Sequence, residues 1–271
     1  MFFDVDGTLV TRNNHIPKST KNAIKELKKN GVLPVIATGR APLLIREIAE
    51  VLDIDTYIAM NGQYIVHKNE VIYANPIEMD LIDGMIELAV DRKDGVLLST
   101  ATEIIANSAI SLVNRGSLYM FLKGLLGIIP ERVKVRMWNR MMSKAPEKEA
   151  YENKEIYMIN INADQEEQKD YEAIFGDVLN FTRANEMSMD IINKGVSKAT
   201  GIARLIKELD ATLDDTYAFG DGLNDMEMLQ YVGTGVAMDN SFDELKIVAD
   251  IVTDSVFSNG IANGLKRLEL I

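Results

Sequence analysis

Residues 2–9 read FFDVDGTL, an apolar start that runs directly into two aspartates and a glycine. Phe2–Val5 is predicted to be a strand that stops before Gly7. A helix is predicted over Pro17–Asn30, because proline stands near its start and a glycine follows its end. Val32–Ala37 is then a near-continuous apolar run, typical of a strand that is buried on both faces. This order of strand, helix and strand indicates the beginning of a parallel sheet.

The same rhythm continues outward from this segment. Apolar residues recur at helical spacing over 45–52, Tyr57–Met60 predicts the next strand, and residues 64–73 resemble a hairpin. After residue 188 the alternation resumes and continues to the end of the chain. We therefore expect an α/β fold with a doubly wound, mostly parallel sheet. The later elements are predicted at Val196–Leu209 (helix), Thr216–Phe219 (strand), Met226–Tyr231 (helix), Thr234–Ala237 (strand) and Ile251–Val252 (strand), before a final helix.

The middle of the chain follows a different pattern. Predicted helices at 78–92 and 108–126 alternate with β-branched or apolar runs at Val96–Thr100 and Glu155–Ile161. One α/β domain interrupted by an inserted α+β domain is the simplest explanation. We place the two parts of the core at 1–79 and 188–271, and the insert at 80–187.

Composition excludes several classes of function. The chain has 271 residues, with 29 Lys and Arg against 41 Asp and Glu, so its formal net charge is −12. This acidity argues against nucleic acid and against an anionic membrane surface as partners. No apolar run approaches the ~20 residues of a spanning helix, and the N-terminal residues lack a signal-peptide pattern. With no cysteine, thiolate chemistry and Cys-ligated metals are excluded, and a cytoplasmic location is expected.

Four polar segments fall where predicted strands end or a predicted helix begins. Ligands of parallel sheets bind at the carboxyl ends of the strands, so these segments are expected to meet at one edge. Alone, the first segment is a turn about as often as a site, the second is more often a turn, and a lone lysine at a helix start is usually solvated. The fourth segment is a stronger signal, although a turn with a helix cap also explains it. All four in this order indicate a site. The segments are Asp4–Thr8, Thr38–Arg40, Val196–Lys198 and Gly220–Asp225.

The residue types in these segments suit an anionic ligand and a cation. Asp4 and Asp6 are two apart, so alternation in an extended segment would point both the same way. Clustered with Asp221 and Asp225 they would repel one another unless a cation sat among them, and oxygen-only ligands favour Mg²⁺. The donors suited to a phosphoryl group are Thr38, Gly39, Lys198 and Asn224.

With their neighbours, these segments resemble the four motifs of the haloacid dehalogenase-like (HAD) hydrolases. They are most similar to the Cof-type phosphatases, whose large cap domain lies between the second and third motifs. The resemblance covers about residues 1–80 and 188–271, and the insert matches the cap in position and size. It implies a Rossmann-like core and a phosphoric monoester hydrolase that depends on Mg²⁺. Small phosphorylated metabolites, with sugar phosphates as the leading class, are the implied substrates. The matching residues are 4–9, 36–40, 195–198 and 220–226.

The resemblance also implies a role for each matching residue. Asp4 corresponds to the nucleophile that forms an aspartyl-phosphate, and Asp6 to the general acid/base. The phosphoryl group would be held by Val5, Thr38, Gly39, Lys198 and Asn224. Magnesium would be bound by Asp4, the backbone carbonyl of Asp6 and Asp221, with Asp225 as a further ligand or through water.

Other interpretations of the same residues remain open. A phosphomutase would use the same intermediate, although mutases of this family generally carry a smaller cap elsewhere. A phosphoryl-accepting switch or binding protein that does not turn over would show similar acidic residues, but such receivers are small and have no large insert. Asn61-Gly62 fits a tight turn as well as a site-lining segment. Residues 116–154 match no known pattern, so the sequence indicates neither the substrate nor the oligomeric state.

Overall fold

A computed structural model describes residues 1–11, 13–106, 145–185 and 188–271. Contacts divide the chain into two units, Met1–Asn75 with Gly195–Ile271, and Pro76–Lys194. Sequence patterns placed these boundaries after 79 and after 187. The second boundary moves because Ser188–Asn193 forms a strand that pairs within the second unit.

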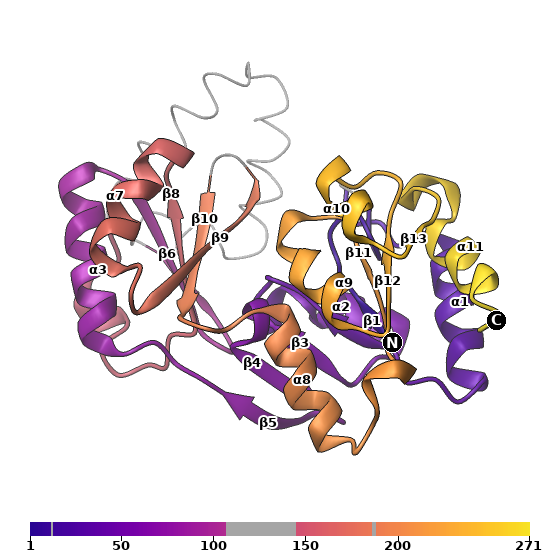
Figure 1. Ribbon diagram of the computed structural model, residues 1–271. Helices are drawn as coiled ribbons and strands as arrows, with labels where there is room; N and C mark the ends of the chain where they lie inside the picture. Colours follow the sequence, from indigo (N-terminus) through magenta and orange to yellow (C-terminus); the bar gives the residue numbers. More distant parts are fainter. Residues whose placement is uncertain (12, 107–144, 186–187) are drawn as a thin grey trace. The chain divides into compact units, whose positions relative to one another are not determined.

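The described part of the first unit is built on one eight-stranded sheet with the order β13-β12-β11-β1-β2-β3-β4-β5 (Figure 1). All neighbours from β13 to β3 are parallel, and β4 and β5 add an antiparallel hairpin at the edge. The expectation of a doubly wound, mostly parallel sheet is therefore confirmed. The strands are β1 (Phe2–Phe3), β2 (Val35–Ala37), β3 (Tyr57–Ala59), β4 (Tyr64–His67), β5 (Glu70–Ala74), β11 (Tyr217–Gly220), β12 (Thr234–Ala237) and β13 (Ile251–Val252).

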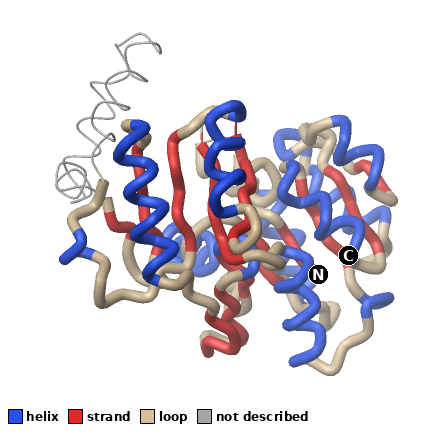
Figure 2. The backbone as a smooth tube through the Cα atoms, turned by 60° about the vertical axis from the view of Figure 1, so that its left-hand side comes forward, coloured by secondary structure: helices blue, strands red, loops and turns tan. Residues whose placement is uncertain are grey.

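Helices cover both faces of this sheet (Figure 2). On one face α1, α2 and α11 bury apolar stripes such as Ile24 and Leu27 of α1. On the other face α8, α9 and α10 bury residues such as Ile202 and Leu229. The helices are α1 (Lys18–Lys29), α2 (Pro42–Leu52), α8 (Lys198–Glu208), α9 (Met226–Tyr231), α10 (Asp243–Val248) and α11 (Gly260–Arg267), with 3₁₀ turns at Met60–Gly62, Leu213–Asp215, Leu223–Asp225 and Val256–Ser258.

Strand β1 is short but central. It lies between β11 and β2, and the ring of Phe3 stacks on Phe219 at 5.4 Å between centroids. Pairing with β11 continues one residue beyond Phe3, since the Asp4 amide donates to the Phe219 carbonyl at 2.9 Å. The carbonyl of Val5 then accepts hydrogen bonds from the amides of Leu9 and Val10. A turn therefore begins at Val5, between the two aspartates. The extended segment on which the alternation argument relied is interrupted there, and the two carboxylates have different partners, Lys198 for Asp4 and Arg40 for Asp6.

The described part of the second unit contains a five-stranded antiparallel sheet, ordered β7-β6-β8-β10-β9. Helices α3 and α7 pack on it, and the hydroxyl of buried Tyr171 donates to Asp94 Oδ2 at 2.7 Å. The expected helix at 108–126 lies outside the described residues. The elements are α3 (Met79–Arg92), β6 (Gly95–Ser99), β7 (Ile104–Ile105), a 3₁₀ turn (Lys148–Ala150), β8 (Met158–Asn162), α7 (Gln165–Phe175), β9 (Leu179–Asn185) and β10 (Ser188–Asn193). Across the described ranges of both units, we find no helix with the length and apolar character that a membrane span requires.

Candidate active site

Lys198 lies at the centre of the site. It is the first residue of α8, and its side chain is fully buried. The helix starts there because Ser197 and Thr200 cap it reciprocally: the Ser197 amide donates to Thr200 Oγ1 at 2.9 Å, and the Thr200 amide donates to Ser197 Oγ at 3.3 Å. From this position Nζ donates to Asp4 Oδ1 and to Asp225 Oδ1, each at 2.6 Å. The ammonium group thus joins the end of β1 to the loop after β11.

Asp225 is held on both sides. Its Oδ1 accepts from Lys198, and its Oδ2 accepts from the amides of Asp221 and Gly222 at 3.0 and 2.9 Å. The carboxylate is completely buried. It therefore closes the loop 221–225 and fixes the position of Lys198 at the same time.

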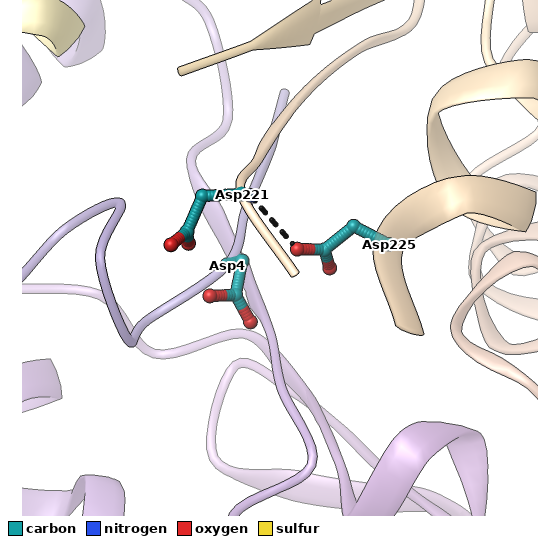
Figure 3. A group of neighbouring side chains, drawn as sticks. All are labelled: Asp4, Asp221 and Asp225. Atoms are coloured by element: carbon teal, nitrogen blue, oxygen red, sulfur yellow. Dashed lines mark hydrogen bonds between the residues drawn. The ribbon is translucent and has the colours of Figure 1, made fainter. Parts of the chain in front are cut away.

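Three carboxylates gather at this point (Figure 3). Asp4, Asp221 and Asp225 each offer an oxygen, and these oxygens lie within 4.8 Å of one another. Asp221 is oriented by Thr8 Oγ1, which donates at 2.9 Å, and by Asn240 Nδ2, which donates at 3.2 Å. Gly7 passes so close to Asp221, with a φ of +81°, that any Cβ would collide with its carboxylate.

The electrostatics of this cluster favour a cation. Burial, and then the charge of Asp225, raise the pKa of Asp4 well above its usual value. Burial, again followed by Asp225, raises the pKa of Asp221 to about 7. Burial opposes the charge of Lys198, but Asp225 and Asp4 outweigh it and raise its pKa. An oxygen-only donor set that carries this much mutual repulsion fits Mg²⁺.

Thr38 and Gly39 follow β2, the strand beside β1. The Arg40 amide donates to Thr38 Oγ1 at 3.1 Å, which closes a tight turn. The guanidinium of Arg40 reaches Asp6, where Nε donates to Oδ2 at 2.7 Å and one terminal nitrogen donates to Oδ1 at 2.6 Å. Asp6 is thereby held by Arg40 and is not one of the three clustered carboxylates.

A second turn connects these segments. Met60, Asn61 and Gly62 all have positive φ, and Asn61 is buried. The Asn61 amide donates to the Thr38 carbonyl at 3.0 Å, and its Oδ1 accepts from Asn224 Nδ2 at 3.3 Å. The side-chain amide of Asn224 is therefore linked to the turn that follows β2.

The structure brings Asp4, Lys198, Asp221 and Asp225 together, as the motif order led us to expect. Asp6 is not one of the clustered carboxylates, and 62% of its side chain is exposed, although its charge is near enough to contribute to the raised pKa of Asp221. Sequence reasoning assigned nothing to Asn240 or to the hydroxyl of Thr8. Asn240 stands three residues beyond the end of β12. Ligands bind at the carboxyl ends of parallel strands, so the argument that selected the other segments would also have selected Asn240. The partnership of Arg40 with Asp6 carried no signal beyond their presence in two motifs.

Comparison with known proteins identifies the family. The model of the haloacid dehalogenase-like hydrolases matches residues 1–265. YkrA from Bacillus subtilis, which is provisionally named a phosphatase, is 37% identical to this chain. The match covers 100% of this chain and 98% of YkrA. Among solved structures, a hypothetical protein from Geobacillus kaustophilus is 36% identical with a TM-score of 0.80, covering 100% of this chain and 98% of that one. The subclass IIB sugar phosphatase BT4131 is 28% identical with a TM-score of 0.81 and the same coverage.

These matches extend over both units and include all of the residues gathered around Lys198. The chain therefore belongs to the haloacid dehalogenase-like hydrolases, as a phosphatase of the Cof type.

Proposed function

We propose that this enzyme is a Mg²⁺-dependent phosphatase that hydrolyses small phosphorylated metabolites in the cytoplasm through a phosphorylated Asp4. The observation that carries the proposal is the fully buried Lys198, which bridges Asp4 and Asp225 beside Asp221. A carboxylate attacks a phosphate dianion only where positive charge offsets their repulsion, and here Lys198 supplies part of it.

In the first step Asp4 displaces the leaving group. Lys198 binds Oδ1 of Asp4, which leaves Oδ2 to form the new bond to phosphorus. As that bond forms, the bond from phosphorus to the leaving oxygen breaks, and Asp6 gives this oxygen a proton. The products of this step are the free alcohol and the phosphorylated Asp4.

In the second step the same residues hydrolyse the acyl phosphate. Asp6, now ionised, takes a proton from a water molecule as its oxygen bonds to phosphorus. The bond from phosphorus to Asp4 breaks, inorganic phosphate leaves, and the Asp4 carboxylate is restored. During both steps the phosphoryl oxygens would be held by the amides and side chains of Val5, Thr38, Gly39, Lys198 and Asn224.

Magnesium would be held by Asp4, Asp221 and the Asp6 carbonyl, and when bound it supplies positive charge to the phosphoryl oxygens. Asp225 was expected to be a further ligand. Its oxygens are already engaged by Lys198 and by two backbone amides, so we propose that it acts mainly by positioning Lys198 and the loop.

Sugar phosphates are the proposed leading substrate class. The support is the sugar phosphatase BT4131, which matches 100% of this chain. A chain with a net charge of −12 must attract an anion through local donors, and these are concentrated around Lys198.

The test is phosphate release from a panel of phosphorylated metabolites, with Mg²⁺ and with EDTA. Asp4→Asn should abolish phosphate release. The control is Asp243, an exposed carboxylate in the first turn of α10, and Asp243→Asn should retain phosphate release. Mass spectrometry of acid-quenched enzyme should find phosphate on Asp4. Release that persists in Asp4→Asn, or in EDTA, would contradict the proposal; a phosphorylated Asp4 without turnover would indicate a switch instead.

A further inference from the structure

Both oxygens of the Asp6 carboxylate accept a hydrogen bond from one neighbour, and each keeps a second lone pair for proton transfer. The donor is the guanidinium of Arg40, at 2.7 and 2.6 Å, in a two-point geometry that is among the strongest charge-assisted contacts. Among the described residues, Arg40 is the sole donor to this side chain. The orientation of Asp6 therefore depends on Arg40.

Arg40 is much better anchored than Asp6. Its amide donates to Thr38 Oγ1, and its carbonyl accepts from the Met60 amide at 3.1 Å. Its guanidinium also donates to the Leu44 carbonyl at 3.3 Å and to Asn14 Oδ1 at 2.6 Å. The exposed fractions of the two side chains are 17% for Arg40 and 62% for Asp6. The backbone and side-chain contacts of Arg40 therefore fix the guanidinium, and the guanidinium in turn sets the position of the Asp6 carboxylate.

The anchors of Arg40 come from the segments that form the site. Thr38 belongs to the proposed phosphoryl-binding turn, and Asn14 lies in the turn that follows the first motif. A guanidinium keeps its charge at any working pH and presents a rigid planar fork, so it holds a carboxylate in one plane as lysine does not. Arg40 accordingly connects the position of Asp6 to the turn that would hold the transferring group.

We propose that Arg40 is the positioning residue of Asp6: it orients the Asp6 carboxylate for proton transfer to and from the reacting oxygens. The inference rests on the proposed function, in which Asp6 is the general acid/base. Arg40 acts through Asp6 and contributes no proton itself.

Leaving-group dependence separates this role from simple phosphate binding. General acid catalysis matters most when the departing oxygen is strongly basic, and it contributes about 10²–10⁴-fold. Arg40→Met should therefore reduce kcat/KM for glycerol phosphate at least about tenfold more than for p-nitrophenyl phosphate, measured with the 271-residue chain. Arg40→Lys should recover part of the difference, because it restores the charge without the fork.

The matched control is Arg267→Met. Arg267 also combines a carboxylate, Asp254 Oδ2 at 3.2 Å, with a backbone carbonyl, that of Val252 at 2.9 Å, but it lies at the other end of the unit's sequence and outside the site. This variant should leave both substrates unaffected. Circular dichroism and thermal melting establish that each variant is folded before its kinetics are compared.

A double-mutant cycle provides the decisive test. If Arg40 works through Asp6, adding Arg40→Met to Asp6→Ala should not lower kcat/KM for p-nitrophenyl phosphate any further. Equal losses for all leaving groups, or a loss that persists without Asp6, would overturn the inference and assign Arg40 to phosphate binding. Absence of phosphatase activity in the wild-type enzyme would instead contradict the proposed function, so the two failures are distinguishable.

Discussion

At the scale of single residues, the site is a balance of buried charges. Lys198 offsets Asp4 and Asp225, and all three side chains are almost completely removed from solvent. A buried charge that loses its partner costs far more than an exposed one, because water cannot compensate for it. The arrangement persists because each charge has a partner with good hydrogen-bond geometry.

The first prediction concerns Lys198. Lys198→Met should lower the free energy of unfolding by about 3–5 kcal/mol in EDTA, since two buried carboxylates lose their counter-charge. Added Mg²⁺ should recover part of the loss by binding at Asp4 and Asp221, where it replaces part of the missing positive charge. Urea denaturation measures both effects. Lys169→Met, at an exposed ion pair with Glu166, is the control and should change little; an equally small effect of Lys198→Met would contradict this account.

The second prediction concerns Asp221 and pH. Its pKa is about 7 in the folded protein against an ordinary value of 3.8, so the folded state binds the proton more tightly. The stability that this group contributes is fully present below about pH 4 and is lost as pH rises through about 7. Metal-free protein should therefore lose stability between about pH 5 and pH 8. Asp4 acts in the same direction, because its pKa is also raised.

Thermal melting across this range, in EDTA and with saturating Mg²⁺, measures the effect. The stabilisation by Mg²⁺ should grow with pH, because the metal competes with protons for the same oxygens. Asp221→Asn should flatten the metal-free profile. A melting temperature in EDTA that rises steadily towards pH 8, with Asp221→Asn unchanged from wild type, would be the opposite of the expected result.

Residue types at strand ends allowed most of this cluster to be predicted. Asp4, Lys198, Asp221 and Asp225 follow from the four motifs, because the order of elements places them at one sheet edge. The pairing of Asp6 with Arg40 did not follow, since alternation holds only while the chain is extended and a turn begins at Val5. The contacts of Thr8 and Asn240 with Asp221 depend on loop geometry that the sequence pattern does not specify.

At the scale of elements, the position of α8 depends on close backbone packing. Gly62 has a φ of +105°, and a Cβ there would collide with the Ser197 carbonyl. A methyl group on Gly201 would lie only 2.7 Å from the side chain of Ile58 in β3 and 3.2 Å from the Cα of Gly62. These two glycines allow the first turn of α8, and with it Lys198, to approach the turn at Met60–Gly62.

The third prediction uses Gly201. Gly201→Ala adds a methyl group where there is no room, which should cost about 1–3 kcal/mol through overpacking despite better helix propensity. Because the strain displaces the turn that carries Lys198, kcat should also fall. Gly84→Ala, inside α3, meets Phe175 only at an ordinary 3.4 Å and should be neutral or stabilising by up to about 1 kcal/mol. If urea denaturation showed that both substitutions lower the free energy of unfolding, or that both raise it, the packing argument would be refuted.

The elements that the sequence predicted are those with a clear apolar period. Helix α1 buries Ala23, Ile24 and Leu27 at helical spacing, and β2 is wholly apolar. Strands β9 and β10 were not predicted, because polar residues such as Asn180, Thr182 and Asp190 interrupt them. Helix α10 was not predicted either, since it has only six residues and one of them, Leu245, is buried.

At the scale of the whole molecule, the two units are separately stabilised. The second unit has its own apolar core, which includes Ile82, Ile159 and Tyr171. Its two ends lie side by side, because Asn193 Nδ2 donates to the Pro76 carbonyl at 3.1 Å. An insertion whose ends meet leaves the surrounding fold nearly undisturbed, which explains why the parallel sheet of the first unit remains continuous on either side of it.

The fourth prediction follows from this division. Every residue of the proposed catalytic site, from Asp4 to Asp225, belongs to the first unit, and so do the helices on both faces of its sheet. Replacing residues 76–194 by a short glycine linker should therefore give a folded protein that still binds Mg²⁺. Because the ends of the removed unit meet, a short linker suffices to join Asn75 to Gly195.

Circular dichroism and calorimetric titration with Mg²⁺ measure folding and metal binding in this shortened chain. Asp221→Asn in the same background is the control and should weaken the binding of Mg²⁺. If the inserted unit takes part in substrate selection, differences in kcat/KM among sugar phosphates should shrink in the shortened chain, while hydrolysis of p-nitrophenyl phosphate is retained in part. A shortened chain that folds and binds Mg²⁺ but keeps the full ranking of substrates would place selectivity in the parallel-sheet unit, whereas an unfolded chain would show that the two cores are not independent.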